Sequence, residues 1–309
     1  MTGHGPAAAK QGETESFTRE NTARILRLAC EAAGQDPHGA WLLRLGSNAV
    51  YRLQVPVVVR IARSPEDLPE ARRGVEVARW LESVDYPAVR ALDVEQPVIV
   101  EGLPVTFWAA VSDDGDDWAS TAEIAHVIRR LHLLESPSGL DLPALDPFSR
   151  AEDRIRSATR LVEDDRNFLT VRLARLKAQW KELKPVLPRG VIHGDASVGN
   201  VLRDRGGIPT LMDLDGFAIG PREWDLVLTA LYYEHFGWHT QQEYATFARE
   251  YGFDVMAWEG YPVMRDTREL LMVTWLAQKA GENAQVASEV WKRIGTLRDG
   301  GSRKDWKPW

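Results

Sequence analysis

Cysteine is nearly absent from this sequence, because Cys30 is the only one among its 309 residues. An intrachain disulfide is therefore excluded, and we expect the chain in the reducing cytoplasm. Long hydrophobic runs are missing too, since no apolar stretch approaches the roughly 18 residues that a membrane-spanning helix needs. The N-terminus also lacks the hydrophobic segment of a signal peptide. We therefore expect no membrane partner.

Lysine is missing from a long stretch of the chain, although arginine is abundant there. No lysine lies between Lys10 and Lys177, so this part of the chain has no lysine side chain to offer to an anion. The formal net charge is -7 and the sequence pI is about 5.6. An acidic protein repels the phosphate backbone of nucleic acids, and we therefore expect no nucleic acid partner.

The first third of the chain combines two helical patterns with several short strand patterns. Residues 1–16 are small and polar and predict a flexible N-terminus. Helical spacing covers residues 17–34 and 65–83. Alternating or β-branched runs predict strands at 41–45, 50–55, 57–62, 89–94, 97–100 and 105–111. The first three of these strands, separated by short turns, predict an antiparallel meander.

The rest of the chain is mainly helical. An acidic, turn-rich segment at residues 112–117 marks the boundary, with a hinge near 108–115. Helical patterns then cover 119–134, 149–184 and 224–297, interrupted by strand patterns at 200–202 and 209–212. We therefore predict an α+β fold of two lobes. Residues 17–111 would form a small antiparallel β lobe, and residues 116–309 a large, mainly α lobe.

Polar side chains that suit metal chemistry cluster around two predicted strands. Asp195 and Asn200 frame a short loop, and Asp213 and Asp215 follow the next strand. A hairpin of these strands would bring Asp195, Asn200 and Asp213 into one cleft. Mg²⁺ takes one or two such protein oxygens and completes its octahedron with phosphates and waters. A remaining carboxylate could accept a substrate proton.

A single aspartate in a turn usually bonds its own backbone. Two β segments that both deliver carboxylates, with an Asp-x-x-x-x-Asn loop between them, are harder to explain in that way. The segment resembles the aminoglycoside phosphotransferase and choline kinase family, whose fold is like that of protein kinases. The likeness covers about residues 40–300 in the order of elements. The matching residues are His193-Gly194-Asp195, Asn200-Val201-Leu202, Asp213-Leu214-Asp215, Gly220-Pro221 and Asp225-Leu226.

The resemblance implies a kinase that moves the γ-phosphate of ATP or GTP to a hydroxyl of a small molecule. Asp195 would be the catalytic carboxylate, which orients the hydroxyl or accepts its proton. Asn200 and Asp213 would bind Mg²⁺. Asp215 would either add a metal contact or orient the loop. The small lobe would then bind the nucleotide, and the large lobe would provide catalysis and bind the acceptor.

Other residues would support the backbone of the catalytic loop or use their own backbone groups to bind the nucleotide. His193 and Asp225 would support the catalytic loop, and Asp225 would do so by accepting backbone N–H bonds. Ala109 and Val111, in the hinge segment, would offer backbone groups to the nucleotide base. Because backbone contacts leave no side-chain signature, ATP and GTP stay equally possible.

A candidate phosphate loop and a candidate cation lie in the small lobe. Gly46, Ser47 and Asn48 separate the first two predicted strands, where kinases of this kind place a loop over the phosphates. The same tripeptide is also an ordinary hairpin turn. The third strand usually carries a lysine for the phosphates, and this chain has Arg60 there. Arginine is always charged and can bind phosphate through two nitrogens, so we expect Arg60 to take this role.

The usual partner of that cation is missing from its expected place. Family members normally offer a glutamate from the first long helix, and the corresponding position here is Gly74. Glu70 lies one turn earlier on the same helix face. Glu70 could reach the cation if the helix adjusts, whereas Glu76, two residues after Gly74, should point elsewhere. Glu70 is therefore our candidate partner, and the sequence leaves open which glutamate, if any, pairs with Arg60.

The acceptor region follows residue 224 and is rich in aromatic and acidic residues. Tyr232, Tyr233 and Trp238 could stack on a ring or enclose a quaternary cation, and Glu234 could pair with an amine. We nevertheless expect most of the rings in this region to pack in the helical core, and most of its acidic residues to lie at the surface.

Three classes of function remain open. The first is an antibiotic kinase that acts on an aminoglycoside or a nucleoside-type natural product and gives resistance. The second is a metabolic kinase of the choline, homoserine or sugar type. The third is a kinase-like protein that binds nucleotide without transferring phosphate, and the intact Asp195, Asn200 and Asp213 argue against it. No feature of the sequence sets the oligomeric state.

Overall fold

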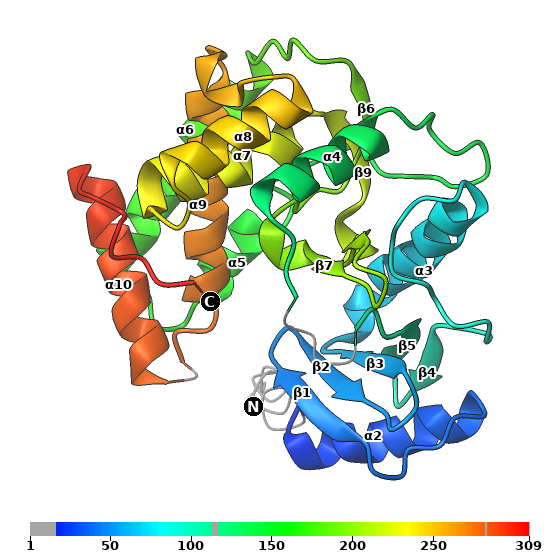
Figure 1. Ribbon diagram of the computed structural model, residues 1–309. Helices are drawn as coiled ribbons and strands as arrows, with labels where there is room; N and C mark the ends of the chain where they lie inside the picture. Colours follow the sequence, from blue (N-terminus) through cyan, green and yellow to red (C-terminus); the bar gives the residue numbers. More distant parts are fainter. Residues whose placement is uncertain (1–16, 113–116, 282, 309) are drawn as a thin grey trace, which may run out of the picture. The chain divides into compact units, whose positions relative to one another are not determined.

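The computed structural model describes residues 17–112, 117–281 and 283–308 (Figure 1). The predictions for residues 1–16 and for part of the hinge lie outside these ranges. The chain forms two compact units. The first consists of the described residues up to Asp117 together with Leu202–Gly216, and the second of Trp118–Val201 with the described residues from Phe217 onward. The predicted small lobe, residues 17–111, does not include Leu202–Gly216.

A five-stranded antiparallel sheet is the centre of the first unit. Its spatial order is β1-β2-β3-β5-β4, so the last strand in sequence lies between β3 and β4. The predicted meander of three strands is confirmed. The strands are β1 (Trp41–Leu45), β2 (Asn48–Arg52), β3 (Val57–Ala62), β4 (Val98–Val100) and β5 (Leu103–Ala109).

The strand predicted at residues 89–94 is wrong. Ala88 makes one isolated bridge to Leu211 and Ala91 makes another to Trp108. This segment therefore divides its backbone bonds between two different partners, and no continuous ladder can form.

Two helices complete the first unit. Thr18 caps α2 (Arg19–Ala32) through a side-chain bond to the backbone of Asn21. The apolar face of α2 packs on the sheet in the hydrophobic core of this unit. Ser64 and Asp67 form a capping box around the 3₁₀ turn that leads into α3 (Leu68–Ser83).

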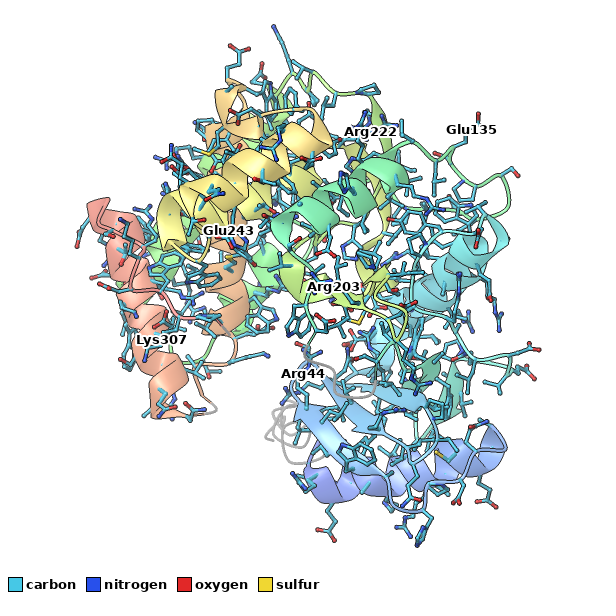
Figure 2. The ribbon with its side chains drawn as sticks, viewed as in Figure 1. Arg44, Glu135, Arg203, Arg222, Glu243 and Lys307 are labelled. Atoms are coloured by element: carbon cyan, nitrogen blue, oxygen red, sulfur yellow. The ribbon has the colours of Figure 1, made fainter. Side chains whose placement is uncertain are left out.

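A small hairpin also belongs to the first unit for most of its length. Its strands are β7 (Val201–Arg203) and β8 (Pro209–Leu211), and the 3₁₀ turn Leu214–Gly216 follows. The backbones of Leu211, Pro87 and Val89 exchange hydrogen bonds of 2.8 and 2.9 Å. Arg203, labelled in Figure 2, forms an ion pair with Asp117. The hairpin is thus bonded to the segment that follows α3 and to the end of the first stretch of chain.

The second unit is mainly helical. Its helices are α4 (Thr121–His132), α5 (Ala151–Ser157), α6 (Glu163–Lys181), α7 (Glu223–Leu231), α8 (Gln241–Tyr251), α9 (Tyr261–Ala277) and α10 (Ala284–Asp299), and a π-helical turn covers Tyr232–Phe236. Helix α9 contacts α5, α6, α7 and α10, and it therefore lies at the centre of this unit (Figure 1). Among the described residues, no helix combines the length and the apolar character needed to cross a bilayer.

A two-stranded antiparallel sheet supports the loop that carries Asp195. It pairs β6 (Arg189–Ile192) with β9 (Ala218–Pro221). Strand β9 was not expected, because four residues that include a glycine and a proline show no strand periodicity. Gly220 fits this close approach, since a Cβ atom would lie 2.7 Å from the side chain of Ile192, which would have to shift.

Candidate functional site

The loop after β6 is held in the second unit by a buried carboxylate. Asp225 lies in the first turn of α7 and is fully buried. Its Oδ2 accepts the backbone N–H of His193 at 2.7 Å, and its Oδ1 accepts that of Gly194 at 2.9 Å. Gly194 has φ +87, a conformation that favours glycine. One aspartate therefore fixes the backbone immediately before Asp195.

A buried histidine compensates for the burial of Asp225. His132, at the end of α4, places Nε2 3.1 Å from Asp225 Oδ2 and Nδ1 2.8 Å from the hydroxyl of Tyr251. Burial raises the pKa of Asp225, but the hydrogen bond and charge of His132, together with His193, outweigh it and lower the pKa below its usual value. Asp225 is therefore a stable carboxylate under the loop.

Asp195 is presented to solvent by this rigid loop. Its side chain is 58% exposed. Asn200 Nδ2 donates to the backbone oxygen of Asp195 at 2.8 Å and to its Oδ2 at 3.3 Å. Because the amide nitrogen of Asn200 faces Asp195, the amide oxygen is the atom that this side chain has for a cation. The backbone N–H of Asp195 donates to His193 Nδ1 at 3.2 Å.

The sequence analysis missed Arg268, which supports the same loop from α9. This buried guanidinium donates to the backbone oxygen of Gly194 at 2.8 Å and approaches Asp195 Oδ1 at 3.4 Å. It also stacks on the ring of Trp224 at 3.8 Å. Burial lowers the pKa of Arg268, although Asp195 and Asp225 act against this. The available signal was the charged pair at positions 268 and 269, which directly precedes the apolar run Leu270-Leu271-Met272-Val273 of α9.

Arg60 and two acidic residues form a second cluster, within the first unit. Arg60 Nη2 lies 2.7 Å from Asp215 Oδ2 and 3.1 Å from Asp213 Oδ1. In the amide orientation that satisfies its neighbours, Asn48 also accepts from Arg60 Nη2, at 2.9 Å. Burial lowers the pKa of Arg60, but the two carboxylates outweigh it and raise the pKa. Arg60 was expected to meet Glu70, and the bonds found here instead join it to Asp213 and Asp215.

Glu70 lies beside this cluster on α3. Its carboxylate is 4.0 Å from Arg73 Nη2, and its charge contributes to a raised pKa of Asp215. The larger cause of that raised pKa is burial, which Arg60 partly offsets. Glu70 is thus near the acidic residues that bind Arg60.

Asp213 has a backbone geometry that suits a special role. Its φ is +57, which is unusual for a residue other than glycine, and its side chain is 45% exposed. Among the described residues, no group of three or more His, Cys, Asp and Glu side chains could hold a metal ion. Mg²⁺ bound to nucleotide needs only one or two protein oxygens, so an exposed Asp213 fits this ion.

The predicted phosphate loop and hinge lie in the first unit. Gly46 and Ser47 connect β1 to β2, and Arg63 donates to the backbone oxygen of Gly46 at 3.1 Å. Ala109 ends β5, and its N–H donates to the backbone oxygen of Arg90 at 2.8 Å. That N–H is therefore used within the unit. Val111 follows two residues later and lies outside the strand.

The predicted acceptor residues lie on and just after the π-helical turn. Tyr232 bonds to Ser197, and burial together with the charge of Asp195 raises its pKa to about 12. Tyr233 stacks on another tyrosine at 5.3 Å. Glu234 accepts from Tyr261 at 2.8 Å and from Arg265 at 3.3 Å. Each of these three residues therefore has a partner within the second unit. The charge of Asp195 contributes to the raised pKa of Tyr232.

Trp238 packs on the core of the second unit, with its ring 4.8 Å from that of Tyr232. The predicted residues therefore fall into two groups, one in each unit. The cleft predicted to contain Asp195, Asn200 and Asp213 involves residues of both units and stays a prediction.

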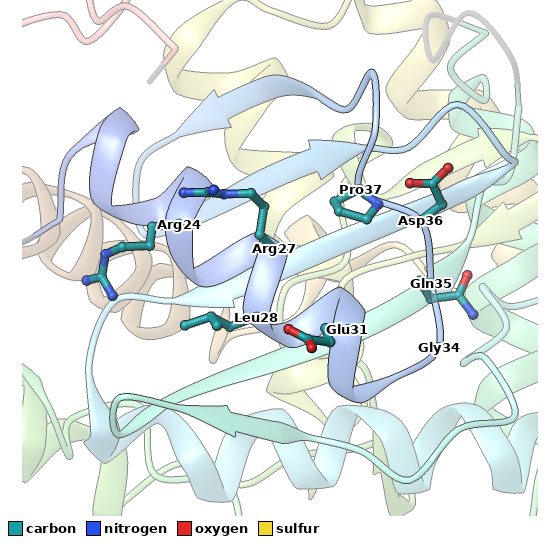
Figure 3. Close-up of a pocket in the computed structure, with 8 residues that line it drawn as sticks. All are labelled: Arg24, Arg27, Leu28, Glu31, Gly34, Gln35, Asp36 and Pro37. Atoms are coloured by element: carbon teal, nitrogen blue, oxygen red, sulfur yellow. The ribbon is translucent and has the colours of Figure 1, made fainter.

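Two hollows in the protein do not contain the predicted site residues. Figure 3 shows the larger, of about 850 Å³, which α2 and the following turn line in the first unit. The other, of about 400 Å³, lies in the second unit next to the end of α6 and the start of α9. The first hollow is lined by Arg24, Arg27, Leu28, Glu31, Gly34, Gln35, Asp36 and Pro37.

Comparison with solved structures identifies the class of fold. The chain is similar to the amicoumacin kinase hAmiN in complex with AMP-PNP, Ca²⁺ and Ami, with a TM-score of 0.72, 14% identity, and coverage of 96% of this chain and 98% of that chain. It is also similar to a microcompartment-associated aminopropanol kinase, with a TM-score of 0.70, 16% identity, and coverage of 91% and 99%. For APH(2'')-IIia in complex with GDP and kanamycin, the TM-score is 0.61, the identity 14%, and the coverage 90% and 99%. The predicted α+β, kinase-like fold is confirmed.

The family follows from the sequence itself. The model of the phosphotransferase enzyme family, APH, matches residues 43–266. The chain therefore belongs to this family, and it is a phosphotransferase with an alcohol group as acceptor. A comparison with curated proteins finds no match.

Proposed function

We propose that this enzyme transfers the γ-phosphate of ATP or GTP, with Mg²⁺, to a hydroxyl group of an antibiotic and so gives resistance by modification. The observation that carries this proposal is the exposed Asp195 carboxylate. The loop that presents it is fixed by hydrogen bonds between its backbone and the buried side chains of Asp225 and Arg268. Preorganised groups of this kind lower the cost of orienting a reacting hydroxyl. A cytoplasmic location would supply the nucleotide.

The chemical step would use Asp195 as the group that meets the acceptor. Asp195 orients the hydroxyl and takes its proton as the hydroxyl oxygen forms a bond to the γ-phosphorus. The bond between that phosphorus and the oxygen that bridges to the β-phosphate breaks, and its electrons stay on the nucleoside diphosphate. The guanidinium of Arg268 lies 3.4 Å from Asp195 Oδ1 and would help to hold this carboxylate in the orientation that meets the hydroxyl.

Other residues would hold the nucleotide. Asn200 and Asp213 are the proposed Mg²⁺ ligands, and the ion would neutralise charge on the phosphates. Arg60 would bind phosphate oxygens from β3, next to the connection between β1 and β2. AMP-PNP, Ca²⁺ and GDP are present in the solved structures that resemble this chain, which supports the use of a nucleotide and a divalent ion.

The antibiotic acceptor is supported by the likeness to the amicoumacin kinase and to the kanamycin complex. The likeness to an aminopropanol kinase supports a second candidate, a metabolic kinase of a small amino alcohol. In both cases, Tyr232 and Glu234 are the proposed acceptor contacts. Tyr232 is close enough to Asp195 for the charge of that carboxylate to contribute to its raised pKa.

A phosphorylation screen tests this proposal. The protein is incubated with Mg²⁺ and either ATP or GTP, and acceptors are examined by mass spectrometry for the gain of a phosphate. The panel contains aminoglycosides, nucleoside antibiotics, amicoumacin-like compounds, choline, aminopropanol, homoserine and simple sugars. Phosphate gain on an antibiotic supports the first candidate, and gain on an amino alcohol alone supports the second.

The role of Asp195 is tested separately. Asp195→Asn should lower kcat by about a thousandfold or more while the nucleotide still binds, because the proton acceptor is lost. Asp153→Asn, at a side chain that is 70% exposed on α5, is the matched control and should keep full activity. Full activity of Asp195→Asn would rule out this mechanism.

A further inference from the structure

A close approach between α3 and the turn after β8 defines an unusual position in the first unit. Gly74 is buried in the middle of α3. A Cβ atom at this position would lie 2.5 Å from Asp215 Oδ1 and 3.8 Å from the backbone nitrogen of Asp215. Real Cβ atoms essentially never come this close to another heavy atom, so any side chain at position 74 displaces the Asp215 carboxylate. Glycine weakens a helix relative to alanine, and this close contact is a physical reason for its presence.

The space next to Gly74 is filled by the carboxylate that binds Arg60. Asp215 Oδ2 accepts from Arg60 Nη2 at 2.7 Å, while Oδ1 faces Gly74. Arg73, the residue before Gly74, donates its Nε to the backbone oxygen of Asp215 at 3.0 Å. The backbone oxygen and Oδ2 of Asp215 therefore accept hydrogen bonds from α3 and β3, and Oδ1 lies against Gly74.

Asp213 differs from Asp215 in the exposure of its side chain and in its distance to Arg60. Its side chain is 45% exposed, compared with 30% for Asp215, and its distance to Arg60 is longer, at 3.1 Å. Asp213 can therefore turn an oxygen toward a cation with less rearrangement. Asp215 would have to give up either its bond to Arg60 or its place beside Gly74.

We infer that Asp215 is the positioning residue for Arg60, and that Gly74 is the position in α3 that makes this arrangement possible. The carboxylate reaches Arg60 from the turn after β8, where the family resemblance leads one to expect a glutamate from the helix. Asp215 thus orients the phosphate-binding arginine and is not a metal ligand. This inference rests on the proposed nucleotide-binding role of Arg60.

An exchange of the two positions tests the inference. The variants are Gly74→Glu, Asp215→Gly and the double variant, with Arg60→Ala to mark the complete loss of the cation. Nucleotide affinity is measured by calorimetry with non-hydrolysable ATP and GTP analogues, in the presence and in the absence of Mg²⁺. Melting temperature is recorded for every protein.

We expect each single exchange to weaken nucleotide binding by about tenfold, toward the value of Arg60→Ala. Gly74→Glu crowds the Asp215 carboxylate, and Asp215→Gly leaves Arg60 without its closer partner. In the double variant, the new glutamate can reach Arg60 from α3 through the space that Asp215 has left. Affinity and melting temperature should therefore return most of the way to those of the unaltered protein.

Two results would overturn the inference. One is a double variant that binds nucleotide no better than the weaker single variant. The other is a Mg²⁺ requirement that rises about tenfold in Asp215→Gly while metal-free nucleotide affinity is unchanged, because that pattern belongs to a metal ligand.

A matched pair of alanine variants gives a second test, in which each substitution adds only one methyl group and disturbs folding less. Gly295 lies in α10 with open space around it, so Gly295→Ala should raise the melting temperature through better helix propensity. Gly74→Ala should lower both melting temperature and nucleotide affinity, because its Cβ displaces Asp215. If Gly74→Ala behaves like Gly295→Ala, the inference fails.

The melting temperatures also separate this inference from the proposed function. If no protein in the series binds nucleotide, the proposed function fails. The recovery of melting temperature in the double variant would still show that position 74, position 215 and Arg60 form one unit. Absence of that recovery would reject the pairing itself.

Discussion

At the scale of single residues, the buried charge of Asp225 is the clearest determinant of loop geometry. Asp225→Asn keeps the shape of the side chain but offers an N–H₂ group to one of two backbone N–H donors. We expect a loss of roughly 3 kcal/mol in the free energy of unfolding at pH 7, because a buried polar network is broken. Chemical denaturation measures this, and the exposed Asp153→Asn should change little.

The same residue predicts a pH dependence. The pKa of Asp225 in the folded protein is below its usual value of 3.8. The ionised carboxylate therefore contributes stability that is complete above pH 3.8 and declines as the pH falls through the lower folded pKa. Denaturation curves between pH 5 and about pH 2 should show this decline in the unaltered protein, and a smaller one in Asp225→Asn. Parallel curves for the two proteins would contradict the assignment.

Arg268 should act on catalysis through the position of Asp195. Arg268→Lys keeps the charge but loses the planar group that stacks on Trp224 and donates to Gly194. We expect kcat to fall by roughly ten- to a hundredfold with little change in the KM for nucleotide. The exposed Arg298→Lys on α10 is the control. A change in nucleotide KM alone would assign Arg268 to a different role.

The sequence predicted the residues whose spacing along the chain is short and chemically distinctive. Asp195 and Asn200 are five residues apart in one loop, and in the structure the Asn200 side chain donates a hydrogen bond to the backbone of Asp195. Arg268 was missed because it reaches that loop from a distant helix. The contact between Gly74 and Asp215 was missed for a related reason, since a glycine in a helix gives no sign of what fills the space beside it.

At the scale of elements, long periodic segments were predicted well and short ones poorly. Strand β3 has the predicted bounds, Val57–Ala62, because its β-branched run is continuous. Strand β9 was not predicted although it exists, and a strand was predicted at residues 89–94 although none forms there. Their backbone partners come from distant parts of the chain, and local pattern carries no information about them.

Trp306 anchors the C-terminal segment that follows α10 in the core of the second unit. Trp306 is 2% exposed, stacks on Phe236 at 5.4 Å and lies under the guanidinium of Arg293. The next residue, Lys307, is labelled in Figure 2 and donates its N–H to Glu289. We expect Trp306→Ala to cost about 3–5 kcal/mol in the free energy of unfolding, as large cavities in cores do.

Helix α10 offers a control for that variant. Trp291 lies on α10 with half of its side chain exposed, so Trp291→Ala should cost far less than Trp306→Ala. Urea denaturation followed by circular dichroism measures both. Equal losses would show that Trp306 is not part of the core of the second unit.

At the scale of the whole molecule, the first unit is built from two separate stretches of chain. The second stretch carries Leu211 and Leu214, which are fully buried. A protein fragment of residues 17–117 should therefore unfold at lower urea concentration, and less cooperatively, than the same fragment with residues 202–216 joined through a flexible linker. A linker of the same length without residues 202–216 is the control, and equal midpoints for all three would contradict this prediction.

The order of elements predicted a small β-rich lobe and a large α-rich lobe, and the resemblance of the motifs around Asp195 implied the kinase-like fold. The family match to residues 43–266 agrees with this resemblance. The assignment of residues 202–216 to the first unit was not. The hairpin interrupts a helical region in the sequence, and its bonds to Pro87, Val89 and Asp117, which are distant in sequence, show where it belongs.

This divided first unit has a consequence for synthesis on the ribosome. Residues 118–201 are translated between its two stretches, and at roughly 5–20 residues per second this takes on the order of ten seconds. Throughout that interval, Pro87 and Val89 lack the backbone of Leu211, to which they bond in the finished protein. The nascent chain therefore carries an incomplete unit, in which the backbone oxygen of Pro87 and the N–H of Val89 still lack the partner that they have in the finished protein, and such incomplete stages are prone to misassociation.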